Sequence, residues 1–583
     1  MTIMKSKFLI LSIFVIAILI GCRSEESSGV SGEKRPNVIL IMTDDQGYGD
    51  LGFTGNSHIH TPHIDRFAAN STHFSSFYAD PVCAPTRSAL MTGKFYLRTG
   101  IYDTFNGGAI MDPDETTIAE IYSANGYRTG IYGKWHLGDN YPCRPSDQGF
   151  DQSLIHKAGG IGQVGDLGNY PRPDSSYFDP VLYRNNEAVK TSGYCTDVFT
   201  DGALEFLDQN GGQPFFLYLA YNAPHGPLQV PESYLERYRG LDFGLEPREA
   251  RAARRVYAMV ENVDENVGRI LGYLEEQALM ENTVVIFMTD NGPVPSRYNA
   301  GLRSTKGTVY EGGIRVPFFI RYPELFQAGE EIPTTVAHVD VLPTLLDICG
   351  LYSEIPEGID GRSMLPILEG DEEFFDTRPL YWQWARGFPE LYTNIAIRRG
   401  PYKLIGHADR NASAGDFELF NIAEDPFEKS NIAGQEPEVA RSLKQQLDQW
   451  YHRTVVEEGN PEIQGCVIDP AFEDPTVLNR NDAKGTPEQW ARDAVYSYWD
   501  VEFQQEGYYD ITFGFHQKPE QEGRVVIKMA PLQFSGYNSD TTITELTLDS
   551  CYFRKGRGML EAYYRVDFGK VISPFSITIS TSE

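Results

Sequence analysis

The sequence contains four strand-like runs separated by stretches of helical period, and this alternation constrains the fold most strongly. The runs are 38–42 (VILIM), 127–132 (YRTGIY), 215–221 (FFLYLAY) and 283–288 (TVVIFM). A continuous apolar run such as 38–42 is typical of a strand buried on both faces. Strands that alternate with helices predict a sheet covered by helices. We therefore expect an α/β fold for residues 37–370.

Each of these runs leads directly into polar or ionisable side chains. These side chains are, in chain order, Asp44, Asp45, Lys134, His136, His225, Asp290 and Asn291. In open α/β sheets, ligands bind at the carboxyl ends of the strands. Any of these residues alone is better explained as a helix cap, a turn or a surface group. Their recurrence after four separate strands favours one shared functional site.

Two of the predicted strand ends supply oxygen donors only. They carry Asp44 and Asp45 after the first run, and Asp290 and Asn291 after the last. Carboxylate and amide oxygens suit Ca²⁺ or Mg²⁺ rather than zinc. The sequence thus predicts a site for a hard divalent cation.

The pattern changes in the last third of the chain. Residues 371–458 contain short antiparallel-strand patterns at 380–384, 395–399 and 402–405 and a closing helix at 436–453, which predicts a small subdomain. From residue 459 to 583, short runs alternate apolar and polar residues between turns. This pattern is typical of a β-sandwich module.

The N-terminus has the character of a targeting segment. Two lysines precede an apolar run at 8–20, which is too short to span a bilayer comfortably and fits a signal peptide over residues 1–21. The run ends in Leu-Ile-Gly-Cys22, which resembles a bacterial lipobox and implies lipidation of Cys22, with 22–36 as a polar tether. The alternative is an ordinary secretory signal with a chance cysteine. We expect an exported lipoprotein of the periplasm, outer membrane or cell surface, held to the membrane by its lipid.

The chain carries a formal net charge of −31 over 583 residues. Such an acidic surface argues against nucleic acid or an anionic membrane face as a partner. An anionic substrate would need a local basic pocket to overcome the general repulsion.

Seven cysteines are present. In an oxidising compartment, Cys143 with Cys195 and Cys466 with Cys551 could be bridged, although connectivity cannot be deduced from sequence. Cys349 lies in an apolar run and is expected to be a buried thiol. The remaining one, Cys83, precedes a proline and an arginine in PVCAPTRSALMTG, an unusual place for a structural thiol.

Taken together and in order, several motifs resemble the type I, formylglycine-dependent sulfatases of the alkaline-phosphatase-like superfamily, and arylsulfatase A in particular. They are NVILIMTDDQGYGDLG, PVCAPTRSALMTG, GYRTGIYGKWHLG, YNAPHGP, TDNG and STKGTVYEGGIRVP. The resemblance covers about residues 37–433, with Thr86 where many members have serine. It implies a mixed sheet sandwiched by helices and a small α+β C-terminal subdomain, followed here by the appended β-sandwich.

The resemblance also implies the chemistry of residue 83. A separate maturation enzyme would oxidise Cys83 to Cα-formylglycine, reading Pro85 and Arg87 as part of its signal. The hydrated aldehyde would attack sulfur and form a covalent sulfate hemiester. Ca²⁺, with Mg²⁺ as the alternative, would be held by Asp44, Asp45, Asp290, Asn291 and residue 83 itself.

The remaining roles follow from the same resemblance. Arg87 and Lys134 would stabilise the charge on the sulfuryl oxygens. His225 and Lys306 would protonate the leaving alcohol, and His136 would take the proton of the second hydroxyl and expel sulfate. The expected function is removal of sulfate from a sulfated carbohydrate, a polysaccharide or its oligosaccharides.

Two other functions stay open at this point. One is hydrolysis of phosphonate or phosphate esters by a protein of the same fold. Phosphatases of this fold usually use a serine or threonine nucleophile and two metals, whereas here Lys134 and Lys306 are expected at the position of the second metal. The other is a glycan-binding lipoprotein without activity. The sugar itself is not encoded in any motif; specificity is expected in the loops at 156–183 and 381–388.

Overall fold

The structure is a computed structural model. It describes residues 35–172, 174–458, 465–485, 496–566, 569 and 571–582. The predicted signal peptide, Cys22 and nearly all of the tether lie outside these residues. Within the described part of the chain, none of the helices combines the length and the apolar character needed to cross a membrane.

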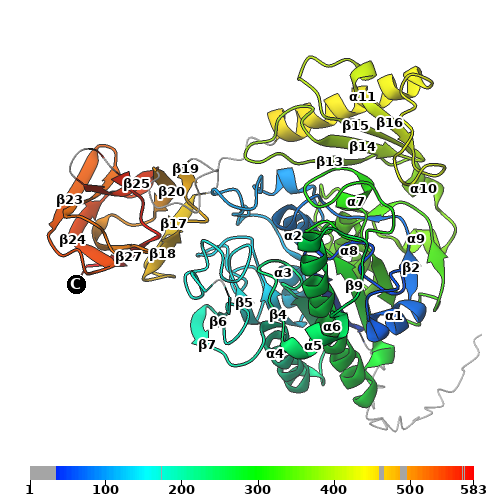
Figure 1. The fold of residues 1–583 in the computed structure, drawn as a ribbon, viewed down its shortest axis with the longest axis horizontal. Helices are drawn as coiled ribbons and strands as arrows, with labels where there is room; N and C mark the ends of the chain where they lie inside the picture. The colour runs from blue at the N-terminus through cyan, green and yellow to red at the C-terminus, as the bar shows by residue number, and fades with distance from the viewer. Residues whose placement is uncertain are drawn as a thin grey trace, which may run out of the picture. The chain divides into compact units, whose positions relative to one another are not determined.

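A ten-stranded sheet forms the centre of the large α/β region, in the order β11-β2-β10-β9-β1-β8-β4-β5-β6-β7 (Figure 1). Its middle consists of β9 (Thr283–Thr289), β1 (Asn37–Thr43), β8 (Phe215–Ala220) and β4 (Arg128–Lys134). These four strands run parallel to one another. The four runs predicted as strands are therefore confirmed, and their carboxyl ends share one edge of the sheet.

The outer strands make the sheet mixed. They are β2 (Thr72–Phe74), β5 (Gln152–His156), β6 (Val181–Arg184), β7 (Glu187–Lys190), β10 (Phe318–Arg321) and β11 (Glu331–Ile332). The β10 strand is antiparallel to β9, and β6 and β7 form an antiparallel hairpin next to β5. A separate pair joins β3 (Phe77–Tyr78) to β12 (Val336–Ala337).

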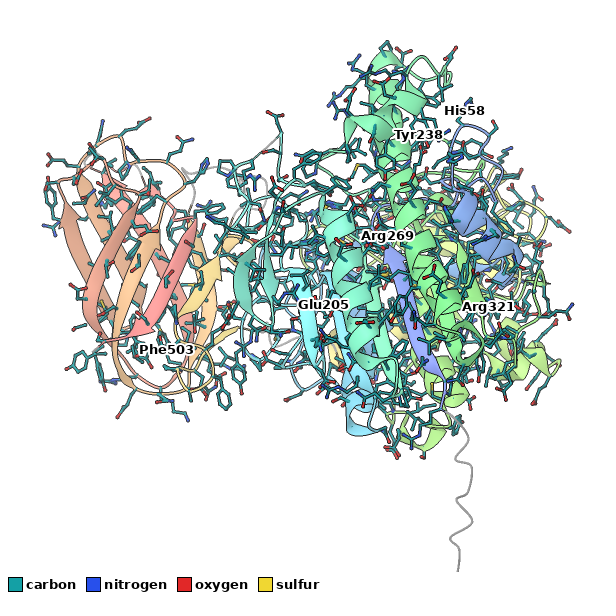
Figure 2. The ribbon with its side chains drawn as sticks, turned by 90° about the horizontal axis from the view of Figure 1, so that it is seen from below. His58, Glu205, Tyr238, Arg269, Arg321 and Phe503 are labelled. Carbon is teal, nitrogen blue, oxygen red and sulfur yellow. The ribbon has the colours of Figure 1, made fainter. Side chains whose placement is uncertain are left out.

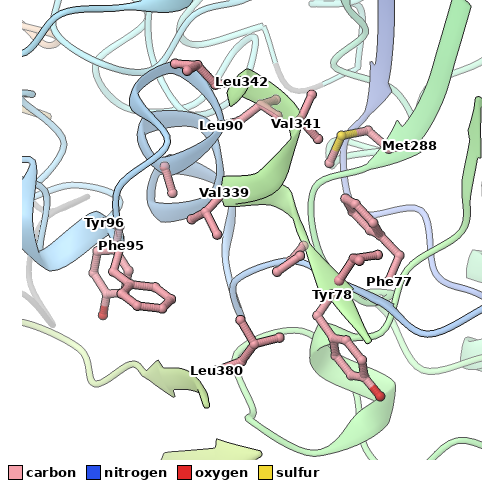
Figure 3. Close-up of a cluster of buried hydrophobic side chains, with 14 of the residues drawn as sticks. Phe77, Tyr78, Leu90, Phe95, Tyr96, Met288, Val339, Val341, Leu342 and Leu380 are labelled. Carbon is pink, nitrogen blue, oxygen red and sulfur yellow. The ribbon is translucent and has the colours of Figure 1, made fainter. Parts of the chain in front are cut away.

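Helices cover both faces of the sheet, because the buried strands point alternate side chains to opposite sides. On one side lie α2 (Cys83–Thr92), α3 (Ile118–Ala124) and α8 (Val341–Ile348); on the other lie α1 (Pro62–Ala69), α4 (Cys195–Asn210) and α6 (Pro247–Glu276), with α5 (Glu232–Tyr238) against α6. Leu40 of β1 joins the first core, which includes Leu90, Met288 and Leu342 (Figure 3), and Ile41 joins the second. The expected α/β sandwich is confirmed.

Residues beyond the sheet form the small subdomain expected from the sequence. Its antiparallel sheet consists of β13 (Leu380–Gln383), β14 (Ile395–Arg399), β15 (Tyr402–Gly406) and β16 (Glu418–Asn421). The helix α11 (Pro437–Tyr451) packs against β14 and β15. Short helices α7 (Glu311–Ile314), α9 (Leu365–Leu368) and α10 (Glu373–Asp376) lie in the preceding connections.

Two further sheets form the C-terminal β-sandwich. One contains β17 (Cys466–Ile468), β20 (Ser497–Phe503), β25 (Gly556–Val566), β22 (Gly523–Met529) and β23 (Leu532–Asn538), with β19 (Lys484–Gly485) and β26 (Val571–Ile572) at its side. The other contains β18 (Thr476–Asn479), β27 (Ser576–Thr581), β21 (Gly507–Gly514) and β24 (Glu545–Phe553). Their inner faces share one apolar core around Trp499 and Phe553.

The sandwich contacts the large α/β region through polar and aromatic groups. Asn479 donates a hydrogen bond to Asp139 at 2.6 Å, and the rings of Tyr141 and Phe472 stack at 4.5 Å. The exact boundary at residue 459 stays a prediction, because residues 459–464 lie outside the described part.

Both proposed disulfide pairings are wrong in this structure. The six described cysteines are buried free thiols, and Cys349 is among them as expected. Cys195 is the first residue of α4 and belongs to the core on that face of the sheet, whereas Cys143 lies against the sandwich and lines the same small cavity as Cys466. Cys466 and Cys551 belong to opposite sheets of the sandwich. Tertiary packing therefore separates the cysteines that the sequence analysis had considered as partners.

Candidate active site

The residues predicted at the strand ends come together at one edge of the central sheet. Asp44 and Asp45 follow β1, and Asp290 follows β9 at the same level, so that the backbone N–H of Asp45 donates to Asp290 Oδ1 at 3.1 Å. Lys134 is the last residue of β4 rather than a loop residue, and its ammonium group lies 2.5 Å from Asp44 Oδ2. His225, beyond β8, places Nε2 3.7 Å from Asp45 Oδ2. The parallel strand order produces this convergence.

The oxygen donors fit a hard divalent cation. Asp44, Asp45, Asp290 and Asn291 are all at most 1% exposed. Within the described residues, Asp44 Oδ1 and Asn291 Oδ1 are buried without a hydrogen-bond partner. The Asn291 amide nitrogen donates to Asp45 and to a backbone carbonyl, which identifies its oxygen as the free ligand atom. Buried oxygen atoms without partners are costly unless they coordinate a cation.

The electrostatics of the carboxylates agree with this fit. Burial and the neighbouring Asp44 carboxylate raise the pKa of Asp290 well above its ordinary value. Burial would also raise the pKa of Asp44, but Lys134 and His225 together hold it well below its ordinary value. A cation among these groups would relieve the repulsion between the two carboxylates.

Cys83 occupies the first position of α2, a ten-residue helix with its N-terminus at the site. The thiol is 2% exposed and lies 3.5 Å from Nδ1 of His136. Its Sγ also lies within 4.8 Å of carboxylate oxygens of Asp44 and Asp290. Burial raises the pKa of the thiol, but Lys134 and Lys306 more than compensate and lower it. Residue 83 is therefore held where a helix N-terminus and cations favour negative charge.

Arg87 lies one helical turn beyond Cys83 and points into the same site. Its guanidinium NH2 is 3.0 Å from Asp290 Oδ2 and 3.4 Å from Asp44 Oδ2, and NH1 donates to the Lys134 carbonyl at 3.1 Å. The side chain is 1% exposed. The helix therefore fixes both the candidate nucleophile and a buried positive charge beside it.

Lys306 completes a local basic pocket in an acidic protein. Its ammonium group pairs with Asp45 Oδ1. Burial would lower the pKa of Lys306, but Asp45 raises it far above its ordinary value, so the group is charged. Arg87, Lys134 and Lys306 thus supply the positive charge that the sequence demanded for an anionic substrate.

The two histidines are fixed by backbone carbonyl groups. His136, which has a positive φ of 64°, donates through Nε2 to the Thr104 carbonyl at 2.8 Å. Because that carbonyl can only accept, Nδ1 is left as the acceptor facing Cys83. His225 bonds through Nδ1 to the Gly226 carbonyl at 2.8 Å, so its Nε2 faces Asp45. Burial lowers the pKa of both imidazoles.

Supporting residues were missed from the sequence. Arg297 forms a fully buried ion pair with Asp50 and donates to the Asp45 carbonyl at 2.8 Å, which holds Asp45 in its positive-φ conformation of 62°. Tyr177 donates to the His225 carbonyl at 2.5 Å. No local signal marks either contact. Thr86 was noted only as a departure from serine; its hydroxyl donates to the Asp290 carbonyl at 2.7 Å, as a serine hydroxyl also could.

Comparisons with known proteins agree with this geometry. The sequence model of the Sulfatase family matches residues 36–351, and that of the N-sulphoglucosamine sulphohydrolase C-terminal region matches residues 304–453. The chain is 31% identical to arylsulfatase A of Homo sapiens, over 72% of this chain and 88% of that protein. It is 29% identical to N-acetylgalactosamine-6-sulfatase of Sus scrofa, over 77% of this chain and 91% of that protein.

A solved structure shows the same likeness. The crystal structure of Ps i-CgsB in complex with k-i-k-neocarrahexaose superposes with a TM-score of 0.63 at 29% identity, and the match covers 74% of this chain and 100% of that one. The family match spans more than half of this chain and contains the cluster of Asp44, Cys83 and Asp290. The chain therefore belongs to the sulfatase family, and is a sulfuric ester hydrolase with the alkaline-phosphatase-like fold.

Proposed function

We propose that this sulfatase removes sulfate from a sulfated carbohydrate, with residue 83 acting after conversion of Cys83 to Cα-formylglycine. The observation that carries the proposal is the position of Cys83, at a helix N-terminus between the oxygen cluster and the cations, with the acceptor Nδ1 of His136 3.5 Å away. The carbohydrate class is supported by relatives named for N-acetylgalactosamine 6-sulfate hydrolysis and by the structure in complex with neocarrahexaose.

A thiol at position 83 could not carry out both steps of this reaction, whereas formylglycine can. Its hydrate has two hydroxyl groups on one carbon, so one can attack sulfur and the other can expel the sulfate afterwards. Asp44, Asp45, Asp290 and Asn291, with residue 83, would hold Ca²⁺, which when bound supplies a Lewis acid for the hydrate and a sulfate oxygen.

The chain's own side chains supply the remaining chemistry. Arg87 and Lys134 flank the position of residue 83 and are placed to stabilise charge on the sulfuryl oxygens. Nδ1 of His136 is placed to accept the proton of the hydroxyl that remains after transfer.

Two further groups are placed for the leaving alcohol. His225 and Lys306 both contact the carboxylate of Asp45. A proton from the Lys306 ammonium group, or from Nε2 of His225 in its imidazolium form, would let the sugar leave as a neutral alcohol rather than an alkoxide. The proposal assigns them as the general acids.

The proposal also covers maturation and location. The intact Cys-x-Pro-x-Arg sequence at 83–87 supports recognition by a formylglycine-generating enzyme. The lipobox-like sequence ending at Cys22 supports export and lipid anchoring. Incorporation of a labelled fatty acid, lost in a Cys22→Ala variant, is the expected result for the anchor.

Mass spectrometry of the peptide containing residue 83 tests the central step. The expected result is an aldehyde in place of the thiol, together with sulfate release from sulfated oligosaccharides that Cys83→Ala abolishes. Phosphate and phosphonate monoesters serve as the competing substrates. A protein that retains the thiol at full activity, or that prefers the phosphorus esters, would contradict the proposal.

A further inference from the structure

A half-exposed arginine lies next to the catalytic residues without a role in the chemistry described above. Arg386 follows β13 in the segment Trp384-Ala385-Arg386, and its side chain is 47% exposed. Its NH1 donates to Asp103 Oδ1 at 2.6 Å and to Thr104 Oγ1 at 3.1 Å. Thr104 is the residue whose carbonyl accepts from His136. Thr104 therefore connects Arg386 to the imidazole of His136.

The same segment also contacts the loop that carries Lys306. The Trp384 ring packs so closely on Gly307 that a Cβ there would lie 3.4 Å from the indole. Asn394 donates to the carbonyls of both Gly307 and Trp384 at 2.8 Å. Gly307 directly follows Lys306 in the chain. The segment 384–386 is thus joined through Thr104 to His136 and through Gly307 to the residue next to Lys306.

The Arg386 guanidinium is held in one orientation. Its Cζ lies 4.6 Å from the Phe105 ring centre and 5.0 Å from the Trp384 ring centre, so two aromatic rings contact it. Asp103 is fully buried and also accepts from the backbone N–H groups of Thr104 and Gly387, which fixes the carboxylate that binds Arg386. A guanidinium restrained in this way loses little entropy when it binds a ligand.

One edge of this guanidinium remains available. Within the described residues, Nε and NH2 of Arg386 have no hydrogen-bond partner, whereas NH1 has two. An arginine edge of two parallel N–H groups matches the oxygens of a carboxylate or a sulfate. The pairing with Asp103 leaves that edge directed away from the carboxylate.

We infer that Arg386 binds a second anionic group of the substrate, so that the preferred substrate carries the scissile sulfate and a further carboxylate or sulfate on the same sugar or its neighbour. This inference rests on the proposed function. Arg386 is a specificity residue in this view. The scissile sulfate is held by Arg87, Lys134 and Lys306, and the second anion is held by Arg386.

Three disaccharide probes test the inference. One carries a single sulfate, the second a sulfate and a uronate carboxylate, and the third two sulfates; 4-nitrophenyl sulfate is the probe without a sugar. Sulfate release by the wild type, Arg386→Ala and Arg386→Lys gives kcat/KM for each. The control is Arg269→Ala, because Arg269 on α6 (Figure 2) is 42% exposed and paired with Asp201, but lies on the outer surface with α4.

We expect Arg386→Ala to lower kcat/KM by about 10-fold to 100-fold for the probe whose second anion is recognised. The loss for the monosulfated disaccharide and the aryl sulfate should stay below about 3-fold. Arg386→Lys should retain part of the selectivity, because it keeps the charge without the planar edge. Whether the uronate or the disulfated probe responds identifies the source of the anion.

Two results would overturn the inference. An equal loss on all four probes would mean that Arg386 acts only by positioning Thr104 and His136. If the wild type prefers neither doubly charged disaccharide, Arg386 does not recognise a second anion. Calorimetric binding to a Cys83→Ala protein, with and without Arg386→Ala, decides the same question without turnover. Failure of the wild type to release sulfate from any probe would instead count against the proposed function.

Discussion

Replacing Lys403 with methionine should destabilise the interface between the large α/β region and the small subdomain. Lys403 lies on β15 with a fully buried side chain, and its Nζ is 2.8 Å from Glu311 Oε1 and 2.9 Å from Glu428 Oε1. Glu311 begins α7, five residues after Lys306. The cluster therefore anchors the loop that carries Lys306, which we propose as a general acid.

The magnitude follows from what the substitution leaves behind. Removing one partner of a buried ion pair costs about 3–5 kcal/mol, because the other charge remains desolvated. Each carboxylate here keeps one other donor: Tyr78 OH donates to Glu311 Oε2 at 2.7 Å, and the Glu311 N–H donates to Glu428 Oε2 at 2.8 Å. We therefore expect a single loss of about 3–5 kcal/mol rather than twice that value.

The cost should depend on pH in a defined direction. In the wild type, burial would raise the pKa of Glu311, but Lys403 and Arg398 bring it below its ordinary value. Its stabilising contribution is therefore present above the unfolded pKa of about 4.3 and is lost as the pH falls. Without Lys403, burial dominates and raises the folded pKa, so the variant loses stability as the pH rises. The difference between the proteins should be larger at pH 8 than at pH 5.

Urea unfolding followed by tryptophan fluorescence measures this effect, because Trp382, Trp384 and Trp450 all lie in the small subdomain. The control is Arg441→Met, which removes a surface pair with Glu438 on α11 and should cost less than about 1 kcal/mol. A loss for Lys403→Met no larger than the control's, or one that grows toward acid pH, would refute the reasoning.

Three further predictions concern the site and the interface with the sandwich. Cys83→Ala and Cys83→Ser should retain the fold by circular dichroism and lose essentially all sulfate release; sustained turnover by the serine protein would contradict the need for an aldehyde hydrate. Chelation should abolish activity and lower the melting temperature, and Ca²⁺ should restore both; recovery with Zn²⁺ alone would count against the oxygen-ligand site. Burial raises the pKa of Asp139 to about 6, and that of Asp482 also rises, so the folded interface holds protons that the unfolded chain releases near pH 4. Stability should therefore fall as the pH rises from about 4 to about 6, and Asp482→Asn should flatten that slope. The fluorescence of Trp499 measures it, because the Trp499 indole N–H donates to the Asn479 carbonyl at 2.7 Å. An unchanged slope in the variant would show that the pair does not titrate.

The sequence alone predicted a sheet covered by helices and one shared site at its strand ends. The run at 38–42 is apolar without alternation, which is typical of a strand covered on both sides. Once such strands are parallel, Asp44 and Asp290 must meet, because all their carboxyl ends lie at one edge. The motif around Cys83, together with the other motifs, indicated the family and hence the expected chemistry. These properties are local, or follow from strand direction, and so can be read from residue order.

Only the tertiary structure decided which distant side chains touch. The pairing of Cys143 with Cys195 failed because Cys143 packs in the core of the sandwich, whereas Cys195 begins α4 and packs in a core of the α/β region. The support of Asp45 by Arg297, and the contact of Arg386 with Thr104, join residues more than 250 positions apart. Such contacts depend on how loops pack at the ends of the strands. Loop side chains follow no period of two or 3.6 residues, so their partners are set by the assembled fold.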